Sequence, residues 1–245
     1  MPSDIEFAAI KLSGSVAVRV DSENDLTHAF DLLGLTKRAV LVLVGGAGGM
    51  NPAGGDERVR NFFFEVLAPL AESCSAIVID GGTDTGVMRL MGEARFAIGG
   101  NFPLLGIAAI DTVLVPKCLG TSKGSTALEP HHSHFLVVPG QRWGDESPWI
   151  ARAASLLSIG FRSLTVVVNG GEITLLDIAC SIRERRPIVV LSGSGRSADR
   201  LARGLNGGSQ EAEIQALLAS GLIQAVDIDR DPQDLTRAMA SCLTA

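Results

Sequence analysis

The sequence predicts an α/β fold, a Rossmann-like doubly wound, mostly parallel sheet with helices on both faces. Three observations support this prediction. Short apolar runs rich in β-branched residues alternate with segments of helical period, the runs are continuous rather than alternating, and most of them end at a glycine. Continuous apolar runs are typical of strands that are covered on both faces. A regular β-α alternation makes the connections right-handed crossovers between parallel strands.

Four strands end at glycine turns. They are expected over residues 38–44, 76–80, 164–168 and 188–191, and the turns that follow them begin at Gly45, Gly81, Asn169 and Ser192. Three further strands are expected over residues 103–109, 135–138 and 222–228. Residues 5–20 are interpreted as one or two strands, with an edge hairpin around Ser13 and Gly14 as one arrangement.

Helices are expected between the strands. Two segments carry apolar residues at the spacing i, i+3, i+4 and i+7, one running from Val59 to Leu70 and the other from Val87 to Ala94. Further helices are predicted over residues 151–158, 173–183, 198–205, 211–219 and 235–243. Residues 111–134 have little periodicity, and a loop of that length inside a compact domain is usually functional or mobile.

Length and composition favour one domain. The 245 residues are 46% hydrophobic with a mean hydropathy of +0.29, so the chain can bury a large core. No linker or block of charge divides it. We therefore predict a single Rossmann-like domain over residues 1–245, with N-terminal strands and a helix over 1–38, a central core over 39–205, and C-terminal helices and a strand over 206–245.

Charge and cysteine content limit the possible partners and the location. A formal net charge of −6 disfavours nucleic acid and an anionic membrane, because both need a basic face. The N-terminus begins with an acidic segment and lacks the apolar region of a signal peptide, so a cytoplasmic location is expected. No Cys-x-x-Cys pair occurs among the four cysteines, which are Cys74, Cys118, Cys180 and Cys242. We therefore interpret them as reduced thiols.

Four glycine turns should meet at one edge of the predicted sheet. The carboxyl ends of parallel strands share an edge, and ligands bind there where the strand order reverses. Glycine lets the backbone approach a phosphate, and the first amides of the following helix carry partial positive charge. A phosphate or pyrophosphate is thus the expected ligand group, although a single such turn could merely reverse the chain. The candidate contacts are Gly45, Gly46, Ala47, Gly82, Thr83, Asp84, Thr85, Gly86, Gly170, Gly171, Gly193, Ser194, Gly195 and Arg196.

Among these residues, Arg196 is the strongest polar candidate. It stands at the start of a predicted helix, where a guanidinium can grip a phosphate with two hydrogen bonds. The alternative is a surface arginine that pairs with Asp199. Trp143, in the turn before the predicted helix at 151–158, either stacks on a base or plugs a surface groove.

Three histidines cluster just before a strand. They are part of Glu129-Pro130-His131-His132-Ser133-His134, a composition that also occurs at metal sites. In an extended segment His132 and His134 point to one side and His131 to the other, so at most two converge. We therefore predict no metal site. A histidine near the strand, His134, is expected to bind the backbone or the ribose of a ligand.

These segments, in this order, resemble the prokaryotic relatives of the N-terminal ligand-binding region of melastatin-type TRP channels, the LSDAT branch of the SLOG superfamily. The resemblance covers about residues 39–205. It rests on residues 81–88 with 92–94, on Gly106-Ile107-Ala108, on residues 128–135, on Val168-Asn169-Gly170-Gly171, and on residues 193–199.

The resemblance implies a domain that binds or senses a nucleotide-derived ligand such as ADP-ribose or a related NAD metabolite. It favours as contacts the Gly45-Gly46-Ala47 turn, the turn from Gly82 to Gly86, and the turn from Gly193 to Arg196. Some relatives carry a basic residue near the phosphate after the Gly106 strand, and Lys117 would supply it here. A protein that only binds such a ligand is expected to require no cofactor besides it.

The same superfamily includes the Lonely-guy phosphoribohydrolases, whose motif PGGxGTxxE carries a glutamate for N-glycosidic cleavage. The corresponding stretch here runs from Asn169 to Asp177, with asparagine for the proline, Ile173 for the third glycine and aspartate for the glutamate. A displaced carboxylate can cost ~100-fold in rate. Asp177 and Glu172 are therefore only weak candidates for catalysis, and whether the protein is an enzyme stays open.

Two functions follow from the sequence. The first is a ligand sensor with the pyrophosphate on the glycine turns and Arg196, and with the sugar near Thr83, Asp84 and residues 131–134. The alternative is a nucleoside-phosphate hydrolase that uses Asp177 or Glu172. DNA binding is disfavoured by the acidic charge and the few aromatic residues. Exposed helices on an open sheet would allow a homodimer, and an effector protein stays unidentified.

Overall fold

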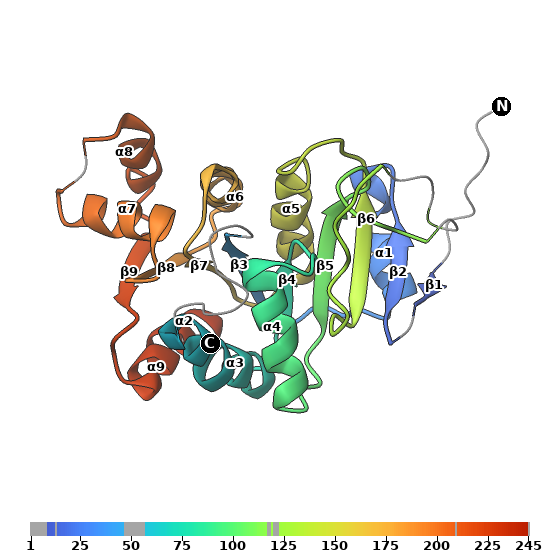
Figure 1. Cartoon of the computed structure of the whole chain (residues 1–245), viewed down its shortest axis with the longest axis horizontal. Helices are drawn as coiled ribbons and strands as arrows, with labels where there is room; N and C mark the ends of the chain where they lie inside the picture. Colours follow the sequence, from blue (N-terminus) through green and yellow to red (C-terminus); the bar gives the residue numbers. More distant parts are fainter. Residues whose placement is uncertain are drawn as a thin grey trace.

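The computed structural model describes residues 9–12, 14–46, 57–116, 119, 123–208 and 210–244. Within these residues the strands form one sheet in the order β1-β2-β6-β5-β4-β3-β7-β8-β9 (Figure 1). β1 pairs antiparallel with β2, and the other neighbouring strands pair in parallel. The predicted Rossmann-like α/β fold is confirmed. The strands are β1 (Ile10–Lys11), β2 (Val16–Arg19), β3 (Val40–Gly45), β4 (Ile77–Asp80), β5 (Leu104–Ala109), β6 (His134–Val138), β7 (Ser163–Val168), β8 (Ile188–Ser192) and β9 (Ile223–Asp227).

Helices cover both faces of the sheet, with α5 to α8 on one side and α2, α3, α4 and α9 on the other (Figure 1). Apart from the first helix, for which only the range 1–38 was predicted, their bounds agree with the predicted ones to within a few residues, which is the usual uncertainty of helix ends. The α-helices are α1 (Leu26–Leu33), α2 (Glu57–Asn61), α3 (Ala68–Ser73), α4 (Gly86–Ala97), α5 (Ser147–Leu157), α6 (Glu172–Arg183), α7 (Arg196–Leu205), α8 (Ala212–Leu218) and α9 (Pro232–Leu243). A short 3₁₀ segment (Glu23–Asp25) precedes α1.

Strand β3 shows why the central strands are apolar without alternation. Val40, Val42 and Val44 pack into the core beneath α1 and α5 to α8. Leu41 and Leu43 point the other way, into the core formed with α2, α3, α4 and α9. All five side chains are at most 3% exposed. A polar residue at any of these positions would therefore be buried in one of two cores.

The strand order reverses at β3. The chain runs outward through β3, β4, β5 and β6, then returns to place β7 on the other side of β3 and continues to β8 and β9. The carboxyl ends of β3 and β7 thus flank the position where ligands bind in open α/β sheets. Gly45 pairs with Val168 at this position.

Two details extend the predictions. The expected N-terminal hairpin forms around Gly14, and β2 then joins the sheet parallel to β6, with Ala17 opposite Phe135. Ser13 lies outside the described residues. The helix expected from Val59 contains a π-helical segment (Phe62–Leu67) between α2 and α3. The wider π turn lets the adjacent Phe62 and Phe63 both bury their rings, with exposed fractions of 2% and 0%.

Candidate functional site

A cavity of about 400 Å³ lies at the carboxyl edge of the sheet, where the strand order reverses. Its wall combines glycines at the ends of β3 and β4, the first turns of α6 and a cationic side chain at the start of α7. Apolar groups and three acids complete it. The lining residues are Leu43, Val44, Gly45, Gly46, Gly81, Thr83, Met88, Trp143, Glu146, Ile150, Gly171, Glu172, Ile173, Thr174, Asp177 and Arg196.

Each of the four predicted glycine turns reaches this cavity with at least one residue, namely Gly45 with Gly46, Thr83, Gly171 and Arg196. The remaining predicted contacts flank these residues without lining the cavity: Gly82, Asp84, Thr85, Gly86, Gly170, Gly193, Ser194 and Gly195. Ala47 and Lys117 lie outside the described residues. The structure thus brings the four turns together.

Close packing explains two of the glycines. A Cβ on Gly45 would lie 2.3 Å from the carbonyl oxygen of Val168 and 2.7 Å from a methyl of Val87. A Cβ on Gly82, which has a φ of +67°, would lie 2.7 Å from the Cα of Gly106. Because real contacts of this length do not occur, side chains at either position would push β3 from β7 or β4 from β5.

The supply of free backbone amides is smaller than the sequence suggests. The amide of Gly82 donates to Asp80 Oδ1 at 2.7 Å. The amide of Gly171 donates to Thr174 Oγ1 at 3.2 Å, and that of Gly193 donates to Asp199 Oδ1 at 2.7 Å. These three amides hold their own turns in shape. The ability of the site to bind an anion therefore depends mainly on the other groups that line the cavity, the first turn of α6 and Arg196.

The turns after β7 and β8 are joined to each other. The amide of Asn169 donates to Ser194 Oγ at 2.8 Å, and the amide of Ala198 donates to the carbonyl of Asn169 at 3.0 Å. Asn169 and Arg196 both have left-handed backbone, with φ of 58° and 47°. Such conformations persist only where the surroundings enforce them, and they concentrate at functional sites.

Arg196 is placed against α6 by this backbone. A Cβ on Gly171 would lie 3.1 Å from a terminal nitrogen of the Arg196 guanidinium. Asp199, the alternative partner considered for Arg196, caps the Gly193 amide through one carboxylate oxygen. The guanidinium and the N-terminus of α6 therefore face the same side of the cavity, which is the arrangement that an anionic group requires.

A buried acid, Glu146, and a half-buried one, Asp177, lie elsewhere in the cavity wall. Glu146 is 7% exposed, and its Oε2 accepts a hydrogen bond from the amide of Gly144 at 3.0 Å. Burial raises the pKa of Glu146, against the effect of backbone hydrogen bonds. Burial also raises the pKa of the half-buried Asp177, and the charge of Glu146 helps to bring it to about 7. Glu146 was not predicted from the sequence, because nothing local marks a glutamate before a helix as buried.

Glu172, the other predicted catalytic candidate, has a different environment. Its side chain is 81% exposed and forms an ion pair with Arg200 at 3.4 Å. A solvated, paired carboxylate is poorly suited to acid-base chemistry at neutral pH. Of the two carboxylates considered, Asp177 is the one with the environment of a functional group.

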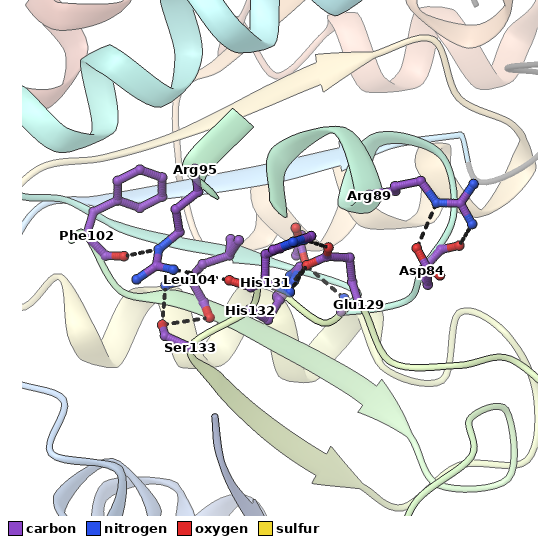
Figure 2. A network of polar contacts seen from close by, with 11 residues as sticks. Asp84, Arg89, Arg95, Phe102, Leu104, Glu129, His131, His132 and Ser133 are labelled. Carbon is purple, nitrogen blue, oxygen red and sulfur yellow. Dashed lines mark hydrogen bonds and ion pairs between the residues drawn. The ribbon is translucent and has the colours of Figure 1, made fainter. Parts of the chain in front are cut away.

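The histidine cluster forms a buried polar array beside the cavity instead of lining it. Both ring nitrogens of His132 face carboxylates, with Nε2 2.8 Å from Asp80 Oδ1 and Nδ1 2.7 Å from Glu129 Oε2. Glu129 Oε1 also lies 2.7 Å from His131 Nδ1. In the view of Figure 2, Glu129 lies between the two histidines on one side and the Asp84–Arg89 pair on the other.

This array is charged. Burial would lower the pKa of His132, but the Asp80 and Glu129 carboxylates raise it to about 9. Burial would raise the pKa of Glu129, but hydrogen bonds from His132 and His131 lower it. An imidazolium with a carboxylate on either side therefore lies next to the β4–α4 turn. We call Asp80, Glu129, His131 and His132 the β4 array.

The β4 array fixes the turn that carries Thr83. Asp80 accepts from the Gly82 amide, and the Glu129 amide donates to the Gly82 carbonyl at 3.0 Å. The segment before the array also pairs with the turn, through a bridge between Thr83 and Leu128. Of the residues 131–134 predicted as sugar contacts, none lines the cavity, and His131 and His132 bond to the carboxylates that hold the protein's own turn.

His134 is also separated from the cavity. It begins β6, two strands away from β4, and its register places it level with Leu105 and Ile79 inside the sheet. Its Nδ1 lies 2.8 Å from Ser133 Oγ, and burial together with nearby Arg95 lowers its pKa. The carboxyl end of β6 is at Val138, so a residue at the start of this strand does not reach the ligand edge.

Trp143 lines the cavity with 45% of its surface exposed.

In the described part of the chain, no three His, Cys, Asp or Glu side chains are arranged to hold a metal ion. Over the same residues, no helix has the length and apolar character needed to cross a bilayer. Cys74, Cys180 and Cys242 are free thiols, and Cys118 lies outside the described residues.

Comparison with known proteins decides the family. Residues 38–237 match the family described as "SLOG in TRPM, prokaryote". The chain belongs to this SLOG family. The resemblance seen in the sequence is thus confirmed over most of the chain.

Relatives of this SLOG protein include channel subunits. It is 28% identical over 241 residues to "Transient receptor potential cation channel subfamily M member 2" of Rattus norvegicus, covering 82% of this chain and 16% of the channel. It is 27% identical over 176 residues to member 6 of Homo sapiens, covering 59% of this chain and 9% of that protein. The chain thus spans less than a fifth of the length of these curated relatives.

A solved structure, the X-ray structure of TM1055, resembles the SLOG protein with a TM-score of 0.57 and 20% sequence identity. The likeness covers 83% of this chain and 99% of that one. At this identity it concerns the fold alone.

Proposed function

We propose that this SLOG protein binds a phosphorylated, nucleotide-derived ligand, with ADP-ribose or a related NAD metabolite as the first choice. The observation that carries the proposal is the convergence of Gly45 with Gly46, the N-terminus of α6 and Arg196 on one cavity at the strand-order reversal. Bare backbone, a helix N-terminus and a guanidinium are the groups that proteins use to bind phosphate oxygens. The family membership supports the same reading.

The size and lining of the cavity support a nucleotide over a free phosphate. About 400 Å³ lies within the range of small-molecule sites. Met88, Ile150 and Ile173 provide apolar surface, and Trp143 offers an aromatic face for a base. A ligand with a diphosphate at the Arg196 side and a nucleoside in the remainder would use both kinds of surface.

The test is to incubate the purified protein with ADP-ribose, NAD and nucleoside monophosphates, then to measure both ligand integrity and thermal stability. A ligand that is recovered intact and raises Tm supports binding or sensing, because a ligand that binds only the folded state stabilises it. The absence of any shift with every phosphorylated compound at millimolar concentration would overturn the proposal.

A second candidate function is N-glycosidic hydrolysis of a nucleoside phosphate. The observation that favours it is the position of Asp177, in the same cavity as Arg196, with a pKa raised to about 7. A carboxyl that titrates near neutrality can act as acid or base at physiological pH. Release of free base from a nucleoside monophosphate, lost in Asp177→Asn, would establish this activity.

A further inference from the structure

A second cavity shares Trp143 with the first. Its volume is about 310 Å³, and apart from the Trp143 ring its side chains are polar or charged. The lining residues are Asp111, Thr112, Lys123, Gly124, Ser125, Thr126, Gln141, Arg142 and Trp143. Because one indole forms part of both walls, a ligand that contacts Trp143 in the first cavity lies at the border of the second.

A rigid turn forms one side of this second cavity. Asp145 Oδ2 accepts hydrogen bonds from the amides of Gln141 at 2.9 Å and Arg142 at 3.1 Å. The Asp145 amide donates in return to the carbonyl of Arg142 at 3.2 Å. These bonds satisfy the backbone of the turn from within. The successive side chains of Gln141, Arg142 and Trp143 are exposed, so an amide, a guanidinium and an aromatic ring are available to a ligand.

The other side of the second cavity is a segment held against the residues that follow β5. The Leu114 amide donates to the carbonyl of Thr126 at 2.8 Å, and Val113 forms a parallel bridge with Thr126. A Cβ on Gly124 would lie 2.2 Å from the amide nitrogen of Val113, so the two backbones are in direct contact there. This contact fixes the backbone beside Lys123, which lines the cavity.

Positive charge prevails in this lining. Lys123 and Arg142 come from the two different sides, and Asp111 adds one carboxylate. Within the residues that the structure describes, the side chains of Lys123 and Arg142 form no hydrogen bond or ion pair, although the charge of Arg142 acts on Asp145. Ammonium and guanidinium groups are donors only, so they need acceptor oxygens. A phosphate monoester supplies three such oxygens and about two negative charges.

We infer that the second cavity binds a second phosphate, on the nucleoside half of the ligand, so that the protein selects a nucleoside bisphosphate over a nucleoside monophosphate. This inference rests on the proposed function, because a base on Trp143 and a 5′-phosphate at Arg196 fix the position of the sugar. With these two groups in place, the 2′ and 3′ oxygens of the sugar are the remaining positions from which a phosphate can reach Arg142 and Lys123.

Titration calorimetry with four nucleotides tests the inference. The probes are AMP, ADP, adenosine 2′,5′-bisphosphate and adenosine 3′,5′-bisphosphate. One of the two bisphosphates should bind at least tenfold more tightly than AMP, which corresponds to about one hydrogen bond between charged groups. ADP carries its additional phosphate on the 5′ side, so its affinity should not depend on Arg142 or Lys123.

Variants of the second cavity should act with opposite signs. Arg142→Gln and Lys123→Gln should each remove most of the advantage of the bisphosphate over AMP. Asp111→Asn should increase that advantage about threefold, because it removes a negative charge beside the phosphate. The affinity for AMP should stay within a factor of about two in all three variants. Arg162→Gln, which changes an exposed arginine just before β7 at the opposite edge of the sheet, serves as the matched control.

The outcomes separate this inference from the proposed function. If AMP binds and neither bisphosphate binds more tightly, the second phosphate site is overturned while the phosphate site at Arg196 stands. The second site is also overturned if the advantage of the bisphosphate persists in both Arg142→Gln and Lys123→Gln, or if these variants weaken ADP as much as the bisphosphate. Failure of all four nucleotides to bind overturns the proposed function and this inference together.

Discussion

At the scale of single residues, Arg196 is the group on which phosphate binding depends most. Its side chain is exposed yet lines the cavity, and its guanidinium lies against Gly171. Arg196→Ala should weaken ADP-ribose binding by about 1.5–3 kcal/mol, the range for a hydrogen bond to a charged group. Titration calorimetry measures this loss. Arg152→Ala, an exposed arginine on α5, is the control, and equal affinity of wild type and Arg196→Ala would contradict the placement.

Asp177 should make stability depend on pH. Its pKa in the folded protein is about 7, above the ordinary 3.8, so between these values the folded state binds more protons than the unfolded state. Stability from this group therefore falls as pH rises from about 4 and levels off above 7. Urea denaturation of wild type and Asp177→Asn across this interval measures it. The free energy of unfolding of the variant, relative to that of the wild type, should increase as pH rises. A difference that stays constant with pH would contradict the raised pKa.

Sequence reasoning found some site residues and missed others for a physical reason. Arg196 and the glycines stand directly after strands, so their position at the carboxyl edge follows from chain order alone. The burial of Glu146 depends on how α5 packs over β3, and local sequence does not encode that contact. The buried position of His132 could not be foreseen, because its partner Asp80 is 52 residues distant in the chain.

At the scale of elements, the β4 array fixes the turn between β4 and α4. His132 has a pKa of about 9 in the folded protein against an ordinary 6.5, so its charge stabilises the fold fully below pH 6.5. That contribution is lost as pH rises through 9. Chemical denaturation of the wild type at pH 6.5 and pH 9.5 should therefore show a drop in the free energy of unfolding. A free energy that is flat over this interval in the wild type would show that His132 is not charged.

The packing of α4 on the β4 array offers a sharper test. Gly92 is buried in this helix, and a Cβ there would lie 2.0 Å from Glu129 Oε2, an atom held by hydrogen bonds to His131 and His132. In an open helix Gly→Ala stabilises by about 1 kcal/mol. Here Gly92→Ala should instead destabilise by about 1–3 kcal/mol, because the carboxylate cannot move without breaking its bonds. Urea denaturation of the wild type and of Gly92→Ala measures this change in stability. A gain in stability in the variant would show that Glu129 is free to shift.

The elements themselves were predictable where periodicity is strong. Central strands such as β3 and β7 are continuous apolar runs, and each was placed to within two residues. The π-helical segment was not foreseen, because Phe62 and Phe63 fit an α-helical apolar stripe equally well in sequence. Only the packing of both rings against the sheet distinguishes the two.

At the scale of the whole molecule, the cavity joins the two halves of the sheet, since β3 and β4 contribute from one half and the elements after β7 and β8 from the other. A ligand there should stabilise the entire fold. At a concentration of 100 Kd the gain is roughly 2.7 kcal/mol, which for a chain of this size corresponds to a rise in Tm of about 5–10 °C. Differential scanning fluorimetry with ADP-ribose measures it.

Two comparisons identify which part of the ligand produces that shift. Adenosine has the base and the sugar but no phosphate, so it should raise Tm far less than ADP-ribose at equal concentration. Arg196→Ala should reduce the shift with ADP-ribose and leave the small effect of adenosine unchanged, because the guanidinium acts on the phosphate alone. If adenosine matched ADP-ribose, binding would be driven by the apolar lining and Trp143, and the glycine turns would have only a structural role.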